Sequence, residues 1–170
     1  MSSGARALAR ASLAAALGTA VLYLGSLLPG GKLALLCVAS LGVVFVKMSC
    51  PGFWAPACYF VTALLSLLLL PNKAPAILYA VFVGYYPLVK LRAERFAAPV
   101  KRWALKLGVF AAAMLALWLL SGSFAPAAEV FEGAALWIVF AAAAAAFFAY
   151  DFALGQLILY YLRNIAGRIK

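Results

Sequence analysis

The chain consists of six apolar runs separated by short stretches rich in Pro, Gly, Ser or charged residues. Hydrophobic residues make up 69% of its 170 residues and charged residues only 11%, which is more apolar surface than one soluble core of this size can shield from water. The sequence therefore predicts an integral membrane protein that is solvated by lipid. The apolar runs cover residues 11–29, 33–46, 53–70, 74–89, 103–121 and 134–162.

The distribution of basic residues predicts how often the chain crosses the membrane. A spanning helix needs about 20 apolar residues, so the second and fourth runs are short, the sixth is long, and length leaves the count open. Cytoplasmic loops collect Lys and Arg. If the amino terminus is inside and each run crosses once, all of the 14 basic residues except Lys32 and Lys73 lie inside, and the segment 90–102 is their largest cluster.

We therefore expect an all-α integral membrane protein, a six-transmembrane-helix bundle in the cell membrane. Both termini are expected in the cytoplasm, the loops are short, and residues 1–170 form a single transmembrane domain. The Pro, Gly and Ser residues between the runs agree with these borders because they end helices and form turns.

Several functional classes are disfavoured by the residues that the chain lacks or places elsewhere. The sequence has no histidine, and Cys37, Cys50 and Cys58 are not spaced as metal ligands, so we expect no metal, no cofactor and no enzyme activity. No Walker motif is present, so ATP hydrolysis has to come from partner proteins. The basic residues, which give the chain a net charge of +10, flank the apolar runs. This placement indicates a signal for membrane orientation rather than nucleic-acid binding.

Small residues recur at helical spacing just before and within the first run, toward its cytoplasmic end, at Ala7, Ala11, Ala15 (or Ala14) and Gly18. Such stripes let a second helix approach closely in lipid. The second helix is either a neighbour within the same bundle or a separate membrane partner, and the spacing does not distinguish the two.

Asp151 is the only acid inside an apolar run. Ionisable side chains at membrane depth are costly and are usually paired. We expect an ion pair with Lys106, which lies at matching depth in the fifth run, and Lys47 is the alternative partner. A structural pair and a proton or cation relay both fit this placement.

Aromatic and polar side chains gather toward the outer ends of the runs, where they fit a small-molecule site or an interfacial belt. At the inner end of the fourth run, Tyr85 and Tyr86 are expected to anchor the chain at the interface, with Pro87 bending its last turn. The candidate ligand-binding residues are Tyr23, Asn72, Tyr79, Trp118, Glu129 and Trp137.

Six short-looped helices, both ends inside and the alanine stripe resemble the substrate-binding (S) components of energy-coupling factor transporters. The resemblance implies that the protein binds a small molecule near the outer face. It also implies that Ala7, Ala11 and Ala15 dock on a transmembrane coupling subunit driven by two ATPase subunits, and that the loops around Asn72 and Glu129 form a gate. The absence of histidine disfavours the nickel and cobalt branch.

The second hypothesis is a membrane scaffold without a transported substrate, similar to the rod-shape protein MreD in size and number of spans. A binding protein should hold an outward cavity lined by Tyr and Trp, whereas a scaffold should be packed solid at that place.

Overall fold

The computed structural model describes residues 3–28, 31–50, 52–94, 99–121 and 136–164. These residues form helices and turns, with no strand among them, which confirms the predicted all-α class. The chain divides into two compact units, Met1–Leu120 and Ser121–Lys170.

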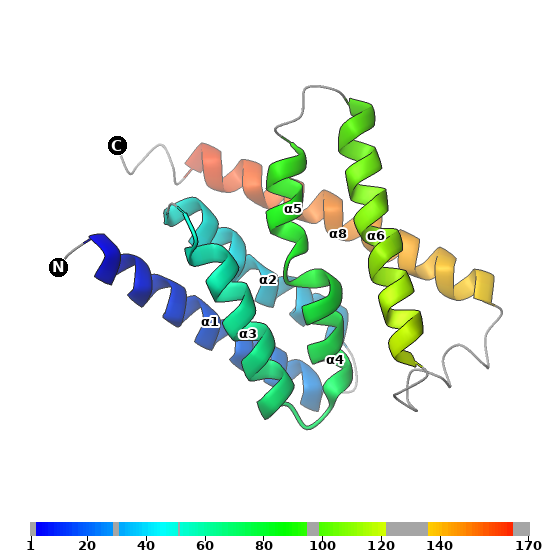
Figure 1. Ribbon diagram of the computed structural model, residues 1–170, viewed down its shortest axis with the longest axis horizontal. Coiled ribbons are helices and arrows are strands. Elements are labelled where there is room, and N and C mark those ends of the chain that lie inside the picture. The colour runs from blue at the N-terminus through cyan, green and yellow to red at the C-terminus, as the bar shows by residue number, and fades with distance from the viewer. Residues whose placement is uncertain (1–2, 29–30, 51, 95–98, 122–135, 165–170) are drawn as a thin grey trace. The chain divides into compact units, whose positions relative to one another are not determined.

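The first unit holds six α-helices and a π-helix (Figure 1). The second holds α8, Leu136–Asn164, whose 29 residues rise about 43 Å at 1.5 Å each, longer than a bilayer core of about 30 Å. The elements of the first unit are α1 Ser3–Leu27, α2 Lys32–Ser49, α3 Trp54–Leu69, α4 Lys73–Leu78, the π-helix η1 Tyr79–Val83, α5 Tyr86–Ala93 and α6 Pro99–Ser121.

Four helical segments of the described residues are long and apolar enough to cross a membrane. They are Gly4–Leu27, Lys32–Ser49, Lys73–Ala93 and Ala143–Tyr160, and the apolar helix Trp54–Leu69 is shorter. These segments support a membrane protein, and the count of six spans stays a prediction.

Several helix borders differ from the predicted runs, and the first and fourth runs show how. Helix α1 begins at Ser3 instead of residue 11, because Arg6 and Arg10 are good helix formers and lie exposed on its first turns. The fourth run is not one helix that ends near residue 89: it is divided into α4, η1 and α5, and it continues to Ala93.

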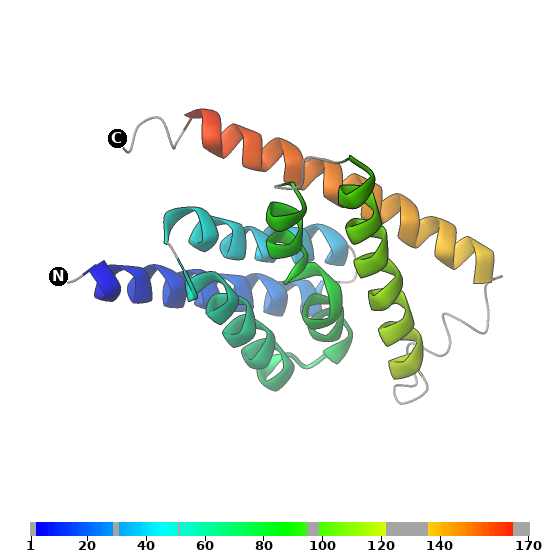
Figure 2. The same ribbon diagram turned by 45° about the horizontal axis from the view of Figure 1, so that its top comes forward.

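Helices α1, α2 and α3 pack against one another, and α2 also contacts η1 and α5 (Figures 1 and 2). Two glycines let the backbones approach closely. A Cβ atom on Gly18 would lie 3.2 Å from Cγ2 of Thr62, and one on Gly42 would lie 3.2 Å from the carbonyl oxygen of Ala14. Helices in lipid have no hydrophobic drive to associate, so the van der Waals contacts made possible by this close approach hold them together.

The alanine stripe belongs to this packing. Ala7, Ala11 and Ala15 are buried in a cluster with residues of α2 and α3, among them Val43 and Cys58. A separate membrane partner cannot contact the three alanines unless it displaces those helices. The three alanines thus pack within the first unit, and their docking on a separate partner stays a prediction.

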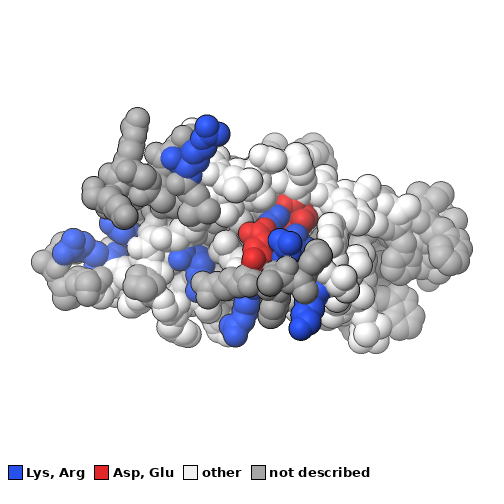
Figure 3. Space-filling view, turned by 90° about the horizontal axis from the view of Figure 1, so that it is seen from above, with Lys and Arg blue, Asp and Glu red and all other residues white. Residues whose placement is uncertain are grey.

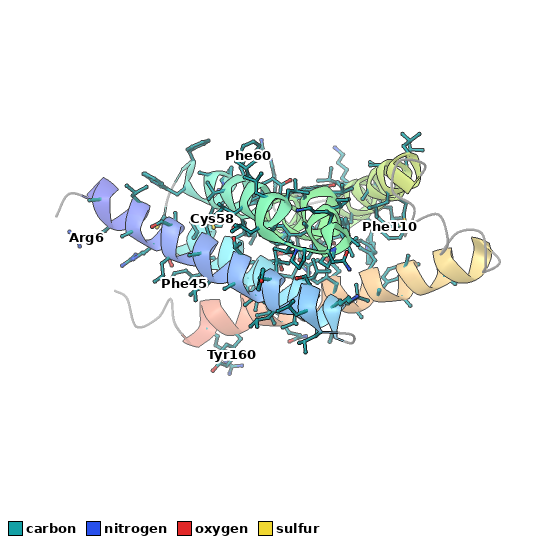
Figure 4. All side chains as sticks on the ribbon, turned by 90° about the horizontal axis from the view of Figure 1, so that it is seen from below. Arg6, Phe45, Cys58, Phe60, Phe110 and Tyr160 are labelled. Atoms are coloured by element: carbon teal, nitrogen blue, oxygen red, sulfur yellow. The ribbon has the colours of Figure 1, made fainter. Side chains whose placement is uncertain are left out.

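Large apolar side chains cover the outside of the helices. Phe60 is 67% exposed and points away from the bundle, whereas Cys58, two residues earlier, is buried (Figure 4). Inside, the hydroxyl groups of Thr19 and Thr62 donate hydrogen bonds to the carbonyl oxygens of Ala15 and Cys58 in their own helices. An apolar outside, together with buried threonine hydroxyl groups that bond within their own helices, suits a lipid environment.

Leucine at position 15 tests the internal role of the stripe. Ala15 is 2% exposed, so Ala15→Leu should overpack the contact with α2 and α3 and lower the free energy of unfolding by about 1–3 kcal/mol. Unfolding in mixed micelles of mild detergent and dodecyl sulfate measures this change. The control is Ala16→Leu, because Ala16 is exposed on the same helix and should tolerate the change within about 0.5 kcal/mol. Equal stability of both variants would contradict the internal packing.

Candidate functional site

The fourth apolar segment is interrupted in its middle. Helix α4 passes into η1, where the Gly84 N–H donates a 2.8 Å hydrogen bond to the carbonyl oxygen of Tyr79. Helix α5 then starts afresh, since Pro87 has no N–H to continue the helix from Val83. Figure 1 shows α5 stepping sideways from the helix that precedes it. π-Helical turns occur frequently at functional sites, and broken membrane helices hold the binding sites of many transporters.

Tyr59 of α3 supports this interruption. Its hydroxyl donates a 2.7 Å hydrogen bond to the carbonyl oxygen of Ala80, inside η1. Its ring lies 6.3 Å from that of Tyr79 and 6.1 Å from that of Tyr85, measured between centroids. Irregular backbone at membrane depth needs such a partner, because no water is there to satisfy its polar groups.

Gly84 is required where these rings meet. A Cβ atom at this position would lie 2.7 Å from Cε1 of Tyr79 and 2.8 Å from Cδ2 of Tyr59, closer than carbon atoms approach without a shift. The backbone at the end of η1 therefore lies directly against two aromatic rings.

Tyr79 itself carries an unsatisfied hydroxyl. Its side chain is 0% exposed, and the hydroxyl makes no hydrogen bond with the described residues. Thr62 lies near enough for a weak hydrogen-bonding interaction with this group, but the two hydroxyls do not form a well-aligned hydrogen bond. A buried hydroxyl without a partner costs about 1–3 kcal/mol, so its retention needs an explanation.

The arrangement places a buried hydroxyl group beside aromatic side chains in the interior of the first unit. Tyr79 offers a hydrogen-bond donor that water does not reach, and Tyr59 and Tyr85 offer aromatic surface beside it. Within the part of the chain that the structure describes, no group of three or more metal-ligating side chains is present.

The structure describes the side chains of three of the six predicted ligand-binding residues, so the predicted site as a whole stays a prediction. Tyr23 is 43% exposed on α1, whereas Tyr79 is in the interior of the first unit. Asn72 caps α4, since its Oδ1 accepts a 3.0 Å hydrogen bond from the Ala74 N–H. The side chains of Trp118, Glu129 and Trp137 lie outside the described residues.

The predicted anchoring role of Tyr86 is wrong. Tyr86 is 0% exposed and packs beside Phe82, with 5.2 Å between the ring centroids, so it is a core residue. Phe82 also meets Phe110 of α6, which is labelled in Figure 4, at 6.2 Å. The hydrophobic pattern could not separate an interfacial from a buried tyrosine at this position.

The expected ion pair joins residues of two units. Lys106 lies in α6 of the first unit, where its Nζ is 5.4 Å from the centre of the Trp103 ring, and Asp151 lies in α8 of the second. The pair therefore stays a prediction.

A groove runs between α1 and α2, on the outside of the first unit. It has a volume of about 400 Å³. Its small residues are Ala14, Gly18, Ala39 and Gly42, and its larger ones are Leu17, Val21, Val38, Leu41 and Phe45. Phe45 marks this groove beside α1 in Figure 4.

Alanine at position 84 tests the interrupted segment. Gly84→Ala should lower the free energy of unfolding by about 1–3 kcal/mol, because the new methyl group must displace the Tyr79 or Tyr59 ring. The matched control is Gly108→Ala in α6, where nothing lies within 4 Å, and it should be neutral or stabilising by up to about 1 kcal/mol. If both variants unfold alike, the rings do not crowd Gly84.

Comparison of the chain with protein-family models, with curated proteins and with solved structures finds no match. The resemblance to substrate-binding components of energy-coupling factor transporters therefore stays a prediction, and what the chain does has to be inferred from its own residues.

Proposed function

We propose that this protein is a membrane transport protein, similar to an energy-coupling factor S component, that holds a small polar molecule within its bundle. The interrupted fourth segment is its binding site. The observation that supports this most is the buried hydroxyl of Tyr79, the first residue of the π-helix, which makes no well-formed hydrogen bond with the described residues. A bound molecule with a hydrogen-bond acceptor would satisfy this hydroxyl and explain its retention.

The site differs from the one that the sequence suggested. Of the six predicted ligand-binding residues, only Tyr79 belongs to it, and its other members come from α3 and from the turn before α5. In the proposed function, six spans place both termini in the cytoplasm, and energy comes from separate ATPase subunits.

The α1–α2 groove supports the second candidate, a scaffold that binds another membrane protein. Its wall is apolar and its floor is made of small residues, which suits a transmembrane helix. A scaffold needs no small molecule at Tyr79, so the two candidate functions differ in whether the purified protein carries a bound small molecule.

Removal of the Tyr79 hydroxyl oxygen, in Tyr79→Phe, distinguishes the transport protein from the scaffold. Protein extracted gently from its native membrane should carry a small-molecule adduct in native mass spectrometry, and Tyr79→Phe should lose that adduct while it keeps the fold. If neither protein carries an adduct and Tyr79→Phe unfolds at a higher temperature, the hydroxyl is only a packing defect, and the transport proposal fails. A co-purifying membrane protein without a small-molecule adduct would favour the scaffold.

The membrane topology is tested by cysteine labelling. Val100 is 77% exposed on α6 and belongs to the cytoplasmic side in the six-span arrangement, whereas the exposed Ala74 belongs to the outer side. A membrane-impermeant maleimide should label Ala74→Cys in intact cells, and Val100→Cys only after permeabilisation. The unsubstituted chain, with Cys37, Cys50 and Cys58, gives the background. Labelling of Val100→Cys from outside would exclude this topology.

A further inference from the structure

A basic pocket lies between the end of α5 and the first turns of α6, in the first unit. Its volume is about 350 Å³, and Glu94, Arg102, Trp103 and Lys106 line it. We propose that this pocket binds the phosphate headgroup of an acidic phospholipid of the cytoplasmic leaflet. The inference is independent of the Tyr79 site.

Arg102 and Lys106, the two cationic side chains of the pocket, both line it from α6. Arg102 and Lys106 are four residues apart on α6, so their side chains lie on one face of the helix. An arginine fork binds two oxygen atoms of a phosphate group at once, and a lysine adds a point charge.

Glu94, the one acid among the described lining residues, already has a basic neighbour. The Oε1 atom of Glu94 lies 4.0 Å from the Nζ atom of Lys90, one turn earlier in α5. Arg92 and Lys101 add further exposed positive charge on the two helices. Figure 3 shows Lys and Arg side chains on a face of the molecule that also carries acidic side chains. Among the described residues in and next to the pocket, the positive charges outnumber the negative one, which favours an anion.

The aromatic wall places the pocket at headgroup depth. Trp103 is 46% exposed, and Trp side chains favour the membrane–water interface, where one end of the ring is wet and the other is in lipid. Glu94 and Arg102 of the pocket belong to the sequence segment 90–102, which is the most basic part of the chain, and acidic lipids attract such segments to the cytoplasmic surface.

The neighbouring surface favours a lipid over a free anion. Val100, Leu105 and Leu107 are exposed on α6, at 77%, 36% and 47%. Apolar side chains beside a phosphate-binding pocket offer a surface for acyl chains, which inorganic phosphate does not have. The combination of two cations, an interfacial Trp and exposed aliphatic residues fits a lipid that carries both groups.

The test uses the full chain in a mild detergent. A short-chain phosphatidylglycerol should raise the unfolding temperature in a saturable manner, whereas phosphatidylcholine of the same chain length and inorganic phosphate should not. Arg102→Gln should weaken this apparent affinity about tenfold, because it removes a charge-assisted contact with the phosphate group. Lys101→Gln is the matched control: it removes the same charge one residue away, from an exposed side chain outside the pocket lining, and should bind as the unchanged protein does.

Each other result overturns the proposal. Equal weakening by Lys101→Gln would mean a diffuse surface charge in place of a pocket. An equal rise of the unfolding temperature with phosphatidylcholine would show that the protein does not recognise the headgroup charge. An equal rise with inorganic phosphate would show a site for any anion. If Arg102→Gln does not fold, Arg102→Lys takes its place, and native mass spectrometry should count fewer bound phosphatidylglycerol molecules on it than on the unchanged protein. An unchanged count on Arg102→Lys would exclude the arginine fork.

Discussion

The close backbone contact among α1, α2 and α3 is the constraint on which the rest of the first unit depends. Lipid gives helices no hydrophobic reason to associate, so contact has to come from van der Waals packing over short distances. Gly18 and Gly42 provide it, because their missing Cβ atoms leave room for Thr62 and for the Ala14 carbonyl group. The alanines of α1 extend the same contact toward the amino-terminal end of this helix.

This three-helix packing makes the interruption of the fourth segment possible. A π-helix followed by a proline-started helix leaves backbone groups that an isolated helix in hydrocarbon cannot satisfy. Tyr59 supplies a donor from α3 to the Ala80 carbonyl group, and its ring rests against the Gly84 backbone. A fixed α3 is therefore a condition for a broken fourth segment, and the Tyr79 hydroxyl is buried as a consequence of both.

The two proposed sites offer different chemistry. The interior around Tyr79 contains hydroxyl groups and aromatic rings, which cost little in hydrocarbon once they are paired. The α5–α6 pocket contains charged side chains: Glu94 and Arg102 belong to the most basic segment of the sequence, and Lys106 is buried one turn further along α6. The two proposals thus assign a neutral polar molecule and an anionic lipid to separate places on one small chain.

The sequence by itself determined the class of the protein, since the apolar content and the turn residues between the runs predicted an all-helical membrane chain with nearly correct borders. It also marked Tyr79 as a candidate ligand-binding residue. It did not reveal the break after Leu78 or the burial of Tyr86, because hydropathy is the same in a continuous and in an interrupted helix. Only the tertiary structure decided that the alanine stripe faces α2 and α3 and that Asn72 caps a helix. It also decided that the Tyr79 ring lies next to the Tyr59 ring while its hydroxyl forms no well-aligned hydrogen bond with the described residues. The physical reason is that a helical stripe shows which residues share a face, whereas the neighbour of that face is set by contacts between segments far apart in the chain.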